Sequence, residues 1–301
     1  MDKQKLKQLA ESVKKNGIET GGEIILPDDL GFVVQKGIDG QADRYSQVAI
    51  TGWSGGGKTT TAEFLARVFE LIAFEGDNIT FHAFADPSYR EITKRIFNLK
   101  DLNSLPEHKD VLEFVYKNYL PITFEKDHDL FAETRSYVVK QLKKAYSDPT
   151  MDFKSHPIFG DAVLYHPKEN GIIKPNGFVM EMCGFHKADI LKRKGNIDRS
   201  KLQTDFLACI INEPEQRKKM LRGRSNNQDF VKAGEMDKVI EIREAVQKKL
   251  LTGVRPDLYA YNLYDDASLV QSVEHIIQMM IGKGVVKRKE ETGKECPVGV
   301  R

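Results

Sequence analysis

The chain has 301 residues, of which 40% are hydrophobic and 30% are charged, a composition that is ordinary for a soluble globular protein. Lysine and arginine number 46 against 44 aspartates and glutamates, and the net charge of +2 gives no bulk argument for nucleic-acid binding. The three cysteines are widely spaced, which argues against a disulfide framework or a zinc site. No stretch approaches the roughly 18 apolar residues of a membrane span. The sequence therefore predicts a soluble, cytoplasmic protein with no membrane partner.

Residues 1–46 precede the first expected core strand and form an N-terminal extension. Apolar residues at helical spacing predict a short amphipathic helix that ends near Asn16. Two short apolar runs, Glu23–Leu26 and Gly31–Gln35, are split by Pro27 and predict a small hairpin. The sequence leaves open whether the extension is a lid, an interaction arm or an addition without a role of its own.

Residues 47–281 carry the pattern of an α/β domain. Helical stretches, the first of them at 60–73, alternate with short apolar runs. This alternation predicts a doubly wound parallel sheet of about five strands, with right-handed crossovers and helices on both faces. The runs expected to form strands are 47–51, 79–84, 178–183, 206–211 and 258–263.

A long insertion, residues 87–176, separates the second and third expected strands. Its apolar spacing predicts helices at 89–97, 111–119 and 130–146, followed by loops with a hairpin around Asp161–Tyr165. The remaining residues, 282–301, form a basic tail of mixed charge that is expected to be frayed.

The strongest motif runs from Gly52 to Thr59 and matches G-x-x-x-x-G-K-[ST] at each constrained position. Glycines let successive backbone amides converge on phosphate oxygens, and the helix expected next presents its positive end to the same anion. Lys58 can reach the β- and γ-phosphates, and the Thr59 hydroxyl can ligate Mg²⁺. The motif therefore predicts ATP and Mg²⁺ as cofactors. The residues expected to hold the nucleotide are those of the loop and the next helical turn: Gly52, Ser54, Gly55, Gly56, Gly57, Lys58, Thr59 and Thr60. Trp53 is expected either to pack against the neighbouring strand or to stack on the nucleotide base.

A phosphate loop predicts nucleotide binding without specifying the reaction. GTPases need an N-K-x-D base-reading motif, and residues 98–101 lack that order. Motor and transporter ATPases place an acidic residue at the end of an apolar strand, and Glu181 stands within the third expected strand. An acid in an apolar strand is costly without a partner, so Glu181 is expected to organise Mg²⁺ or its water. The pattern favours a kinase, and a non-kinase P-loop ATPase remains the competing class.

Residues 213–232 directly follow the fourth expected strand and contain several arginines. Phosphoryl transfer spreads negative charge over the equatorial oxygens, which guanidinium groups bind at two points. Arg222 and Arg224 lie beside Gly223 and a polar stretch, which is typical of a mobile lid. Arg222 and Arg224 are the candidates, at least one of which is expected to act with Lys58 in catalysis, and a solvated run of charges is the alternative.

The stretch Phe84–Ile92, together with residues 57–65, resembles phage-type deoxynucleoside monophosphate kinases. In that family an F-A-D-P stretch follows the second strand and leads into a helix. The similarity covers roughly residues 47–105. P-loop kinases usually keep their acceptor site in an insertion such as residues 87–176, so that stretch is expected to be the acceptor side. The resemblance implies a P-loop kinase that transfers the γ-phosphate of MgATP to a nucleotide-type acceptor, most simply a deoxynucleoside monophosphate, in the host cytoplasm if the chain is encoded by a phage.

Asp86 lies at the expected carboxyl end of the second strand, beside the phosphate loop. A carboxylate there can accept a proton from an attacking hydroxyl or hold a nucleoside sugar, although an aspartate before a proline is also a sound helix cap. Arg90 follows as an acceptor-binding cation. The resemblance implies one further substrate-binding arginine, at the position of Arg135.

The chain departs from the resembling family in length. It adds the N-terminal extension and the stretch Asp148–Pro175. Extra surface beside an acceptor pocket can admit a larger acceptor, such as the 5-hydroxymethyluracil in DNA that some phage-like P-loop kinases phosphorylate. Lysines and arginines at 187–194, together with the tail, could then contact phosphates. Modified DNA therefore remains the alternative partner, and the sequence does not specify the oligomeric state.

Overall fold

The structure is a computed structural model that describes most of the chain. The described residues are 3–16, 18–20, 23–25, 32–34, 46–97, 109–115, 134, 137–138, 140–142, 144–145, 148, 151–167, 177–181, 205–251 and 256–288.

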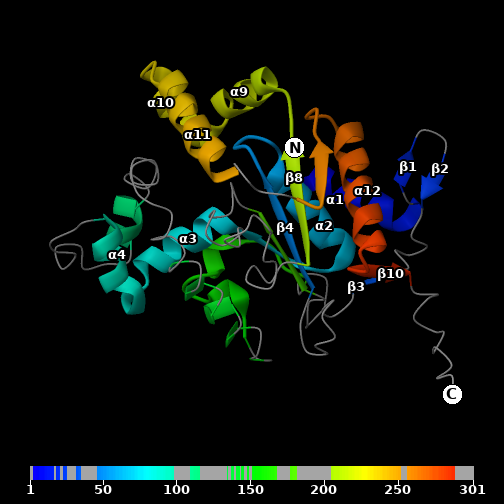
Figure 1. Cartoon of the computed structure of the whole chain (residues 1–301), viewed down its shortest axis with the longest axis horizontal. Coiled ribbons are helices and arrows are strands. Elements are labelled where there is room, and N and C mark those ends of the chain that lie inside the picture. The colour runs from blue at the N-terminus through cyan, green and yellow to red at the C-terminus, as the bar shows by residue number, and fades with distance from the viewer. Residues whose placement is uncertain are drawn as a thin grey trace, which may run out of the picture.

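The chain forms an α/β protein around a mixed sheet of six strands (Figure 1). In spatial order, the strands are β6 (Val163–Tyr165), β5 (Ile72–Glu75), β7 (Gly177–Glu181), β4 (Ser46–Gly52), β8 (Phe206–Ile211) and β9 (Leu258–Tyr261). Strands β5, β7, β4, β8 and β9 run parallel, whereas β6 pairs with β5 in the antiparallel direction. The expected α/β class is present, but the sheet has one strand more than expected and is not purely parallel. This arrangement is compatible with a Rossmann-like or P-loop fold.

The expected second strand at 79–84 is wrong. Those residues belong to helix α3 (Gly76–Ala85), in which Ile79, His82 and Ala83 are buried at the i, i+3, i+4 spacing of a helix. The second strand is β5, where the buried apolar run ends at the carboxylate of Glu75. The other expected strands form at 46–52, 177–181, 206–211 and 258–261.

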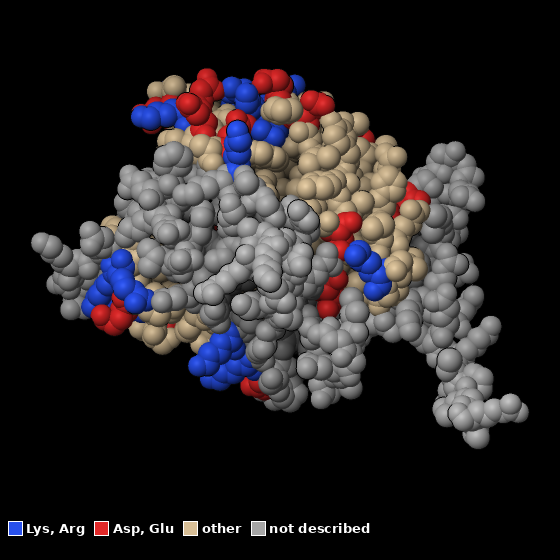
Figure 2. All heavy atoms as spheres, in the orientation of Figure 1, with Lys and Arg blue, Asp and Glu red and all other residues tan. Residues whose placement is uncertain are grey.

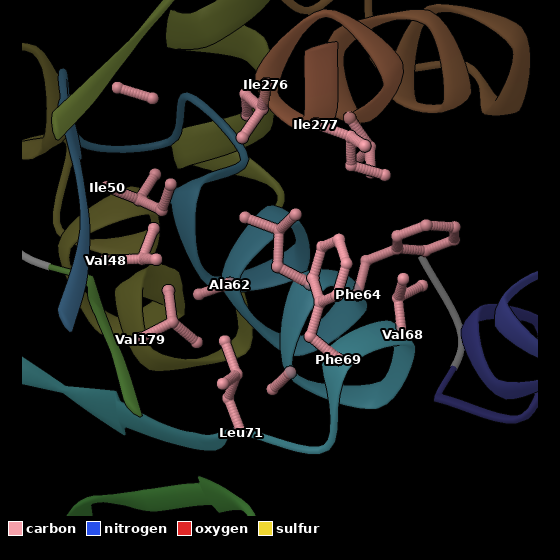
Figure 3. Packing of buried hydrophobic residues seen from close by; sticks show 14 of the residues in the cluster. Val48, Ile50, Ala62, Phe64, Val68, Phe69, Leu71, Val179, Ile276 and Ile277 are labelled. Atoms are coloured by element: carbon pink, nitrogen blue, oxygen red, sulfur yellow. The ribbon is translucent and has the colours of Figure 1, made fainter. Parts of the chain in front are cut away.

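One face of the sheet is covered by α1 (Lys3–Asn16), α2 (Lys58–Phe69) and α12 (Asp266–Gly282). Side chains alternate along a strand, so every second residue of β4 and β8 points into this layer. Figure 3 shows the packing of the fully buried side chains that join strands and helices. The labelled members of this cluster are Val48, Ile50, Ala62, Phe64, Val68, Phe69, Leu71, Val179, Ile276 and Ile277.

The opposite face, at β5 and β7, packs against α3 and a set of aromatic residues. Phe74 of β5 lies 5.7 Å from Phe153 and 5.8 Å from Phe159 between ring centroids. Phe178 of β7 contacts Phe74 edge-on. Helices therefore cover both faces of the sheet in this region, as expected for a doubly wound domain. Short helices η3 (Phe153–Ser155) and η4 (Gly160–Ala162) lead into β6.

The N-terminal extension is built into the main core. Leu6 and Ala10 of α1 are buried against α2. The expected hairpin between the runs at 23–26 and 31–35 is wrong, because each run pairs elsewhere. Strand β2 (Glu23–Ile25) pairs with β1 (Ile18–Thr20), and β3 (Phe32–Val34) pairs with β10 (Val286–Arg288) near the C-terminus.

The acceptor-side insertion begins with η2 (Pro87–Tyr89) and α4 (Arg90–Phe97), where a helix is expected. Residues 109–115 are helical as well. Of the expected hairpin around 161–165, residues 163–165 form β6, which pairs with β5, some 90 residues earlier in the chain. Residues 168–176, which would complete a hairpin, lie outside the described residues. Local sequence predicts that a segment is extended, whereas its partner depends on the fold.

Three helices stand together beyond the carboxyl end of β8 (Figure 1). They are α9 (Pro214–Arg222), α10 (Gln228–Lys232) and α11 (Met236–Leu251), with η6 (Ser225–Asn227) between the first two. Leu221 of α9 packs with Met236 and Ile240 of α11 in a small core of its own. No helix in the described part of the chain is long and apolar enough to cross a membrane.

Candidate active site

The phosphate loop connects β4 to α2 at the carboxyl end of a central strand. The loop contains three glycines with positive φ angles, 136° at Gly52, 78° at Gly55 and 88° at Gly57. Residues other than glycine rarely adopt such angles. Space is restricted as well, since a Cβ atom on Gly52 would lie 2.3 Å from the carbonyl oxygen of Ile210. The loop therefore requires glycine for both its backbone conformation and its close packing.

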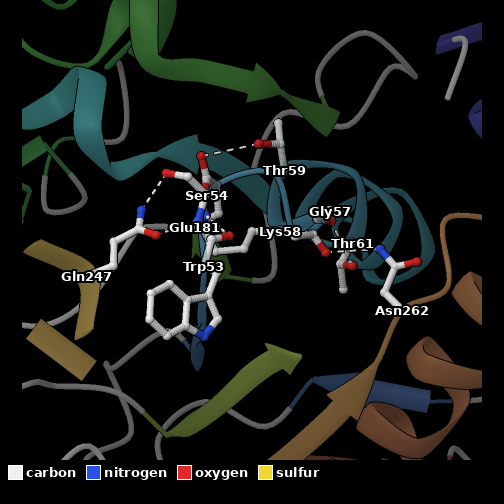
Figure 4. Close-up of polar contacts among 10 residues, drawn as sticks. Trp53, Ser54, Gly57, Lys58, Thr59, Thr61, Glu181, Gln247 and Asn262 are labelled. Atoms are coloured by element: carbon white, nitrogen blue, oxygen red, sulfur yellow. Dashed lines mark hydrogen bonds and ion pairs between the residues drawn. The ribbon is translucent and has the colours of Figure 1, made fainter. Parts of the chain in front are cut away.

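Lys58 and Glu181 form a buried ion pair behind this loop (Figure 4). The Lys58 Nζ atom lies 3.9 Å from Glu181 Oε2 and donates a hydrogen bond to the carbonyl oxygen of Trp53 at 3.3 Å. The Thr59 hydroxyl donates to Glu181 Oε1 at 3.3 Å. The contact arises because β7 pairs directly with β4, which brings the end of β7 beside the start of α2. The residues Lys58, Thr59 and Glu181, which were chosen from sequence, therefore lie together.

Two further carboxylates, Glu75 and Asp77, stand on the β5 side of this pair. Glu75 is the register partner of Glu181 across β5 and β7, so the two side chains share one face of the sheet. Asn78 donates a hydrogen bond to Glu75 Oε2 at 2.6 Å and fixes its orientation. The sequence analysis did not select either carboxylate. The usable signal is the apolar run of residues 71–74 that ends at Glu75.

Burial and neighbouring carboxylates raise the pKa of both Glu75 and Glu181. Burial is the main cause that raises the pKa of Glu181; Lys58 opposes it, whereas Asp77 and Glu75 add to it. Burial also raises the pKa of Glu75, with a further contribution from Asp77 and opposition from Arg224 and Lys58. The site is therefore rich in negative charge, and the cations that act on Glu75 are those of the loop and of the α9–α11 region.

The oxygens of Thr59 and Glu181 fit Mg²⁺. This ion prefers oxygen ligands, keeps several waters, and binds through one or two carboxylates together with substrate phosphates. The two side chains offer a hydroxyl and a carboxylate within hydrogen-bonding distance of each other. Among the described residues, no group of three or more His, Cys, Asp or Glu side chains could hold a metal ion alone. The residues Thr59 and Glu181 could therefore supply part of the coordination of a magnesium ion, with other ligands completing it.

Residues that follow β8 and β9 support the loop from the other side. The Asn262 side-chain amide donates to the carbonyl oxygen of Gly56 at 3.0 Å, and its Oδ1 accepts from the backbone of Tyr264 at 2.8 Å. The Asn212 side chain donates to the Tyr264 hydroxyl. Burial raises the pKa of this hydroxyl, while the charges of Arg217, Arg224 and Lys58 oppose the shift. The Tyr264 hydroxyl therefore lies within the electrostatic influence of Arg217, Arg224 and Lys58.

Helices α9 and α11 lie directly on the phosphate loop. The guanidinium of Arg217 stacks on the ring of Trp53, 4.7 Å from its centroid, and pairs with Glu244 of α11. Gln247 of α11 accepts a hydrogen bond from the backbone amide of Ser54 at 2.9 Å and donates one to its hydroxyl. Trp53 therefore packs against an arginine of α9, a contact that neither expectation from sequence named, and its stacking on a nucleotide base stays a prediction.

The two arginines expected in catalysis have different positions. Arg222 pairs with Asp237 at 2.6 Å on the exposed surface of α9 and α11, and this partner raises the pKa of Arg222. The structure therefore places Arg222 on the outer surface of these helices, and its expected role in catalysis stays a prediction. Arg224 is exposed, but its charge acts on Glu75. The buried arginine at the loop is Arg217, which sequence reasoning did not select because several arginines share this stretch.

Asp86 does not lie at the end of a strand. It ends α3 and caps η2, where its Oδ1 accepts from the amide of Ser88 at 2.8 Å and from its hydroxyl at 2.6 Å. The ten residues of α3 span about 15 Å, which separates Asp86 from Glu75 by a helix length. The expected place of Asp86 beside the phosphate loop is therefore wrong, and Glu75 occupies it.

The surroundings of Asp86 form a second polar cluster at the far end of α3. The hydroxyls of Ser88 and Tyr137 are 2.6 Å apart, and Tyr137 stacks on Tyr89 at 4.6 Å between centroids. Arg90 begins α4, and its Nε atom is buried without a hydrogen-bond partner among the described residues. Arg135 lies outside the described residues.

Comparison with known proteins adds little to this geometry. No protein-family model matches the chain, and no curated protein matches it. Among solved structures, TT1252 from Thermus thermophilus is similar over 78% of this chain and 97% of its own, with 14% identity and a TM-score of 0.44. The function of the chain therefore has to be argued from the site itself.

Proposed function

We propose that the chain is an ATP-dependent phosphotransferase, a P-loop kinase that moves the γ-phosphate of MgATP to a nucleotide-type acceptor. The observation that carries the proposal is the buried group of Lys58, Thr59 and Glu181 at the end of the glycine loop. Transfer of a phosphoryl group from a nucleoside triphosphate requires a lysine at the phosphates and oxygen ligands for Mg²⁺, and this site offers both.

Each part of the site has a role in this proposal. The loop amides and the N-terminus of α2 bind the phosphates, and Lys58 exchanges its contact with Glu181 for one with the β- and γ-phosphates. Thr59 and Glu181 hold Mg²⁺, which neutralises charge that develops on the transferred group. In this proposal Arg224, whose charge lowers the pKa of Glu75, contacts the γ-phosphate.

Charge on the α9–α11 helices bears on the nature of the acceptor. Figure 2 shows that basic and acidic side chains are interspersed over this part of the surface. Lys218 pairs with Glu215 and Arg222 pairs with Asp237. A polyanion such as DNA binds best to a continuous basic surface, so these helices favour a small acceptor over the alternative of modified DNA.

Transfer of labelled phosphate tests the proposal. The protein is incubated with γ-labelled MgATP and separate acceptors: nucleosides, mononucleotides, plain DNA and hydroxymethylated DNA. We expect label in an organic product, and we expect Lys58→Ala to abolish it while Lys218→Ala, a change on the exposed face of α9, retains it. Release of label only as inorganic phosphate, at a rate unchanged by every acceptor, would establish the competing ATPase class.

A further inference from the structure

A buried glutamine of α11 binds the phosphate loop at two points. The Gln247 Oε1 atom accepts a hydrogen bond from the backbone amide of Ser54 at 2.9 Å, and its Nε2 atom donates to the Ser54 hydroxyl (Figure 4). The residue is 4% exposed. The oxygen and the nitrogen of one buried carboxamide therefore both bind a single residue of the loop.

The same helices hold the two neighbouring residues of the loop. The Arg217 guanidinium stacks on Trp53, and Glu244 of α11 pairs with it. A Cβ atom on Gly55 would lie 3.4 Å from Cγ of Arg217, so α9 packs closely on the loop. Glu244 precedes Gln247 by three residues, which places both on one face of α11. Helix α11 is therefore anchored at the loop through Arg217, about one helical turn before Gln247.

We infer that Gln247 is a latch that competes with the phosphates of the nucleotide for the phosphate loop. The inference rests on the proposed phosphotransferase function, in which the loop amides bind phosphate oxygens. A backbone amide has one hydrogen to donate, so the amide of Ser54 cannot bind Gln247 and a phosphate oxygen at full strength together. The nucleotide therefore displaces Gln247 when its phosphates enter the loop.

The charges at the loop explain why Gln247 gives way and Arg217 does not. The carboxamide oxygen of Gln247 is an acceptor, as a phosphate oxygen is, whereas Arg217 is a cation and gains from a nearby phosphate. Helices α9 and α11 also share a small core of their own, formed by Leu221, Met236 and Ile240. The end of α11 that carries Gln247 can therefore shift from the loop while the packing between the two helices is kept.

The latch lowers the apparent affinity for the nucleotide. Only the unlatched form offers the Ser54 amide to a phosphate, and the apparent affinity falls in proportion to the fraction of protein in that form. Each intramolecular hydrogen bond shifts such an equilibrium by about 2–12-fold. Loss of both bonds from Gln247 should therefore raise the apparent affinity about 5–100-fold.

The affinity of Gln247→Met for a nucleotide tests the latch. Methionine has a similar length and fills the buried position, but it cannot form the two hydrogen bonds to Ser54. The Kd of the full chain for the magnesium complex of β,γ-imido-ATP, measured by isothermal titration calorimetry, should fall about 5–100-fold. Gln271→Met, the same change at an exposed position of α12, is the matched control and should leave Kd unchanged.

Two further variants separate a latch from a residue that only supports the shape of the loop. In Gln247→Glu a carboxylate still accepts from the Ser54 amide and repels the phosphates, so Kd should rise, opposite to Gln247→Met. Ser54→Ala removes the hydroxyl that Gln247 binds and should lower Kd about 2–12-fold. The double variant Ser54→Ala/Gln247→Met should bind no more tightly than Gln247→Met alone.

The outcomes distinguish the latch from the proposed function. An affinity that is unchanged or weaker in Gln247→Met overturns the latch, and Ser54→Ala alone decides the question if Gln247→Met does not fold. Transfer of label to an acceptor by the unaltered chain leaves the phosphotransferase proposal standing in that case. Failure of the unaltered chain and of the variants to bind the analogue overturns both.

Discussion

Replacing Gly57 with alanine tests the packing of the phosphate loop. Gly57 is the residue before α2 and has a φ of 88°. A Cβ atom there would lie 2.1 Å from Asn262 Nδ2, so the amide has to leave its place. That movement breaks the buried hydrogen bond from Asn262 to the carbonyl oxygen of Gly56. The substitution therefore affects the backbone conformation and the support of the loop together.

The expected cost is the sum of these two effects. A residue with a side chain at this φ costs about 1–2 kcal/mol, and a buried carbonyl left without its donor costs about 1–3 kcal/mol. Gly57→Ala should therefore lower the free energy of unfolding by about 2–5 kcal/mol. Gly234→Ala is the control, because Gly234 has a φ of 72° and nothing within 4 Å of an added Cβ. Gly234→Ala should therefore lower the free energy of unfolding only by the cost of the backbone conformation, about 1–2 kcal/mol.

Urea unfolding with a common m-value measures both changes. The double variant Gly57→Ala/Asn262→Ala should cost less than the sum of the two single variants, since the clash and the hydrogen bond involve the same side chain. Equal costs for Gly57→Ala and Gly234→Ala, or full additivity in the double variant, would show that Asn262 does not support the loop.

Three further substitutions test other parts of the structure. Leu6→Ala should lower the free energy of unfolding by about 2–4 kcal/mol because Leu6 of α1 is part of the main core. A urea unfolding curve identical to that of the unaltered chain would contradict this place of α1 in the core. Arg217→Ala should weaken ATP binding and quench or shift the fluorescence of Trp53, whereas Arg222→Ala on the exposed surface should change neither. Burial lowers the pKa of His156, so the contribution of the neutral side chain to stability is present above the ordinary histidine pKa and is lost as the pH falls below it. The His156→Asn variant should therefore lose less stability than the unaltered chain between pH 7 and pH 5. An identical dependence of stability on pH in the two proteins would contradict the assignment.

The loop and its two flanking elements follow from sequence because each has a strong local cause. The motif fixes the positions where only glycine is compatible with the backbone, and β4 is a run buried on both faces. The end of α2, in contrast, is not marked by any local sequence signal. Glu70 ends the helix at a φ of 56°, where glycine is the usual residue, and no stop is visible in the sequence. The apolar residues of β5 therefore continue the helical pattern, which displaced the second strand and misplaced Asp86.

Contacts between distant segments account for the rest of what sequence did not show. Gln247 reaches Ser54 across 193 residues, and Asn262 reaches Gly56 across 206. Neither pair has a local pattern, because a polar residue on an amphipathic helix or beyond a strand looks the same whether it contacts solvent or a loop. The buried group of Lys58, Thr59 and Glu181 could be chosen from residue type and spacing. The sequence predicts where helices occur in the chain, but it does not predict how those helices pack over the loop.

A single-turnover measurement tests the central claim most directly. Protein in excess over γ-labelled MgATP is mixed with the pooled acceptors, and the fate of the label is followed in the unaltered chain and in Lys58→Ala. The account predicts that the label moves from ATP to an organic acceptor in one phase, and that it stays on ATP in Lys58→Ala. Label that remains on ATP in both proteins, or that leaves only as inorganic phosphate, would contradict the account.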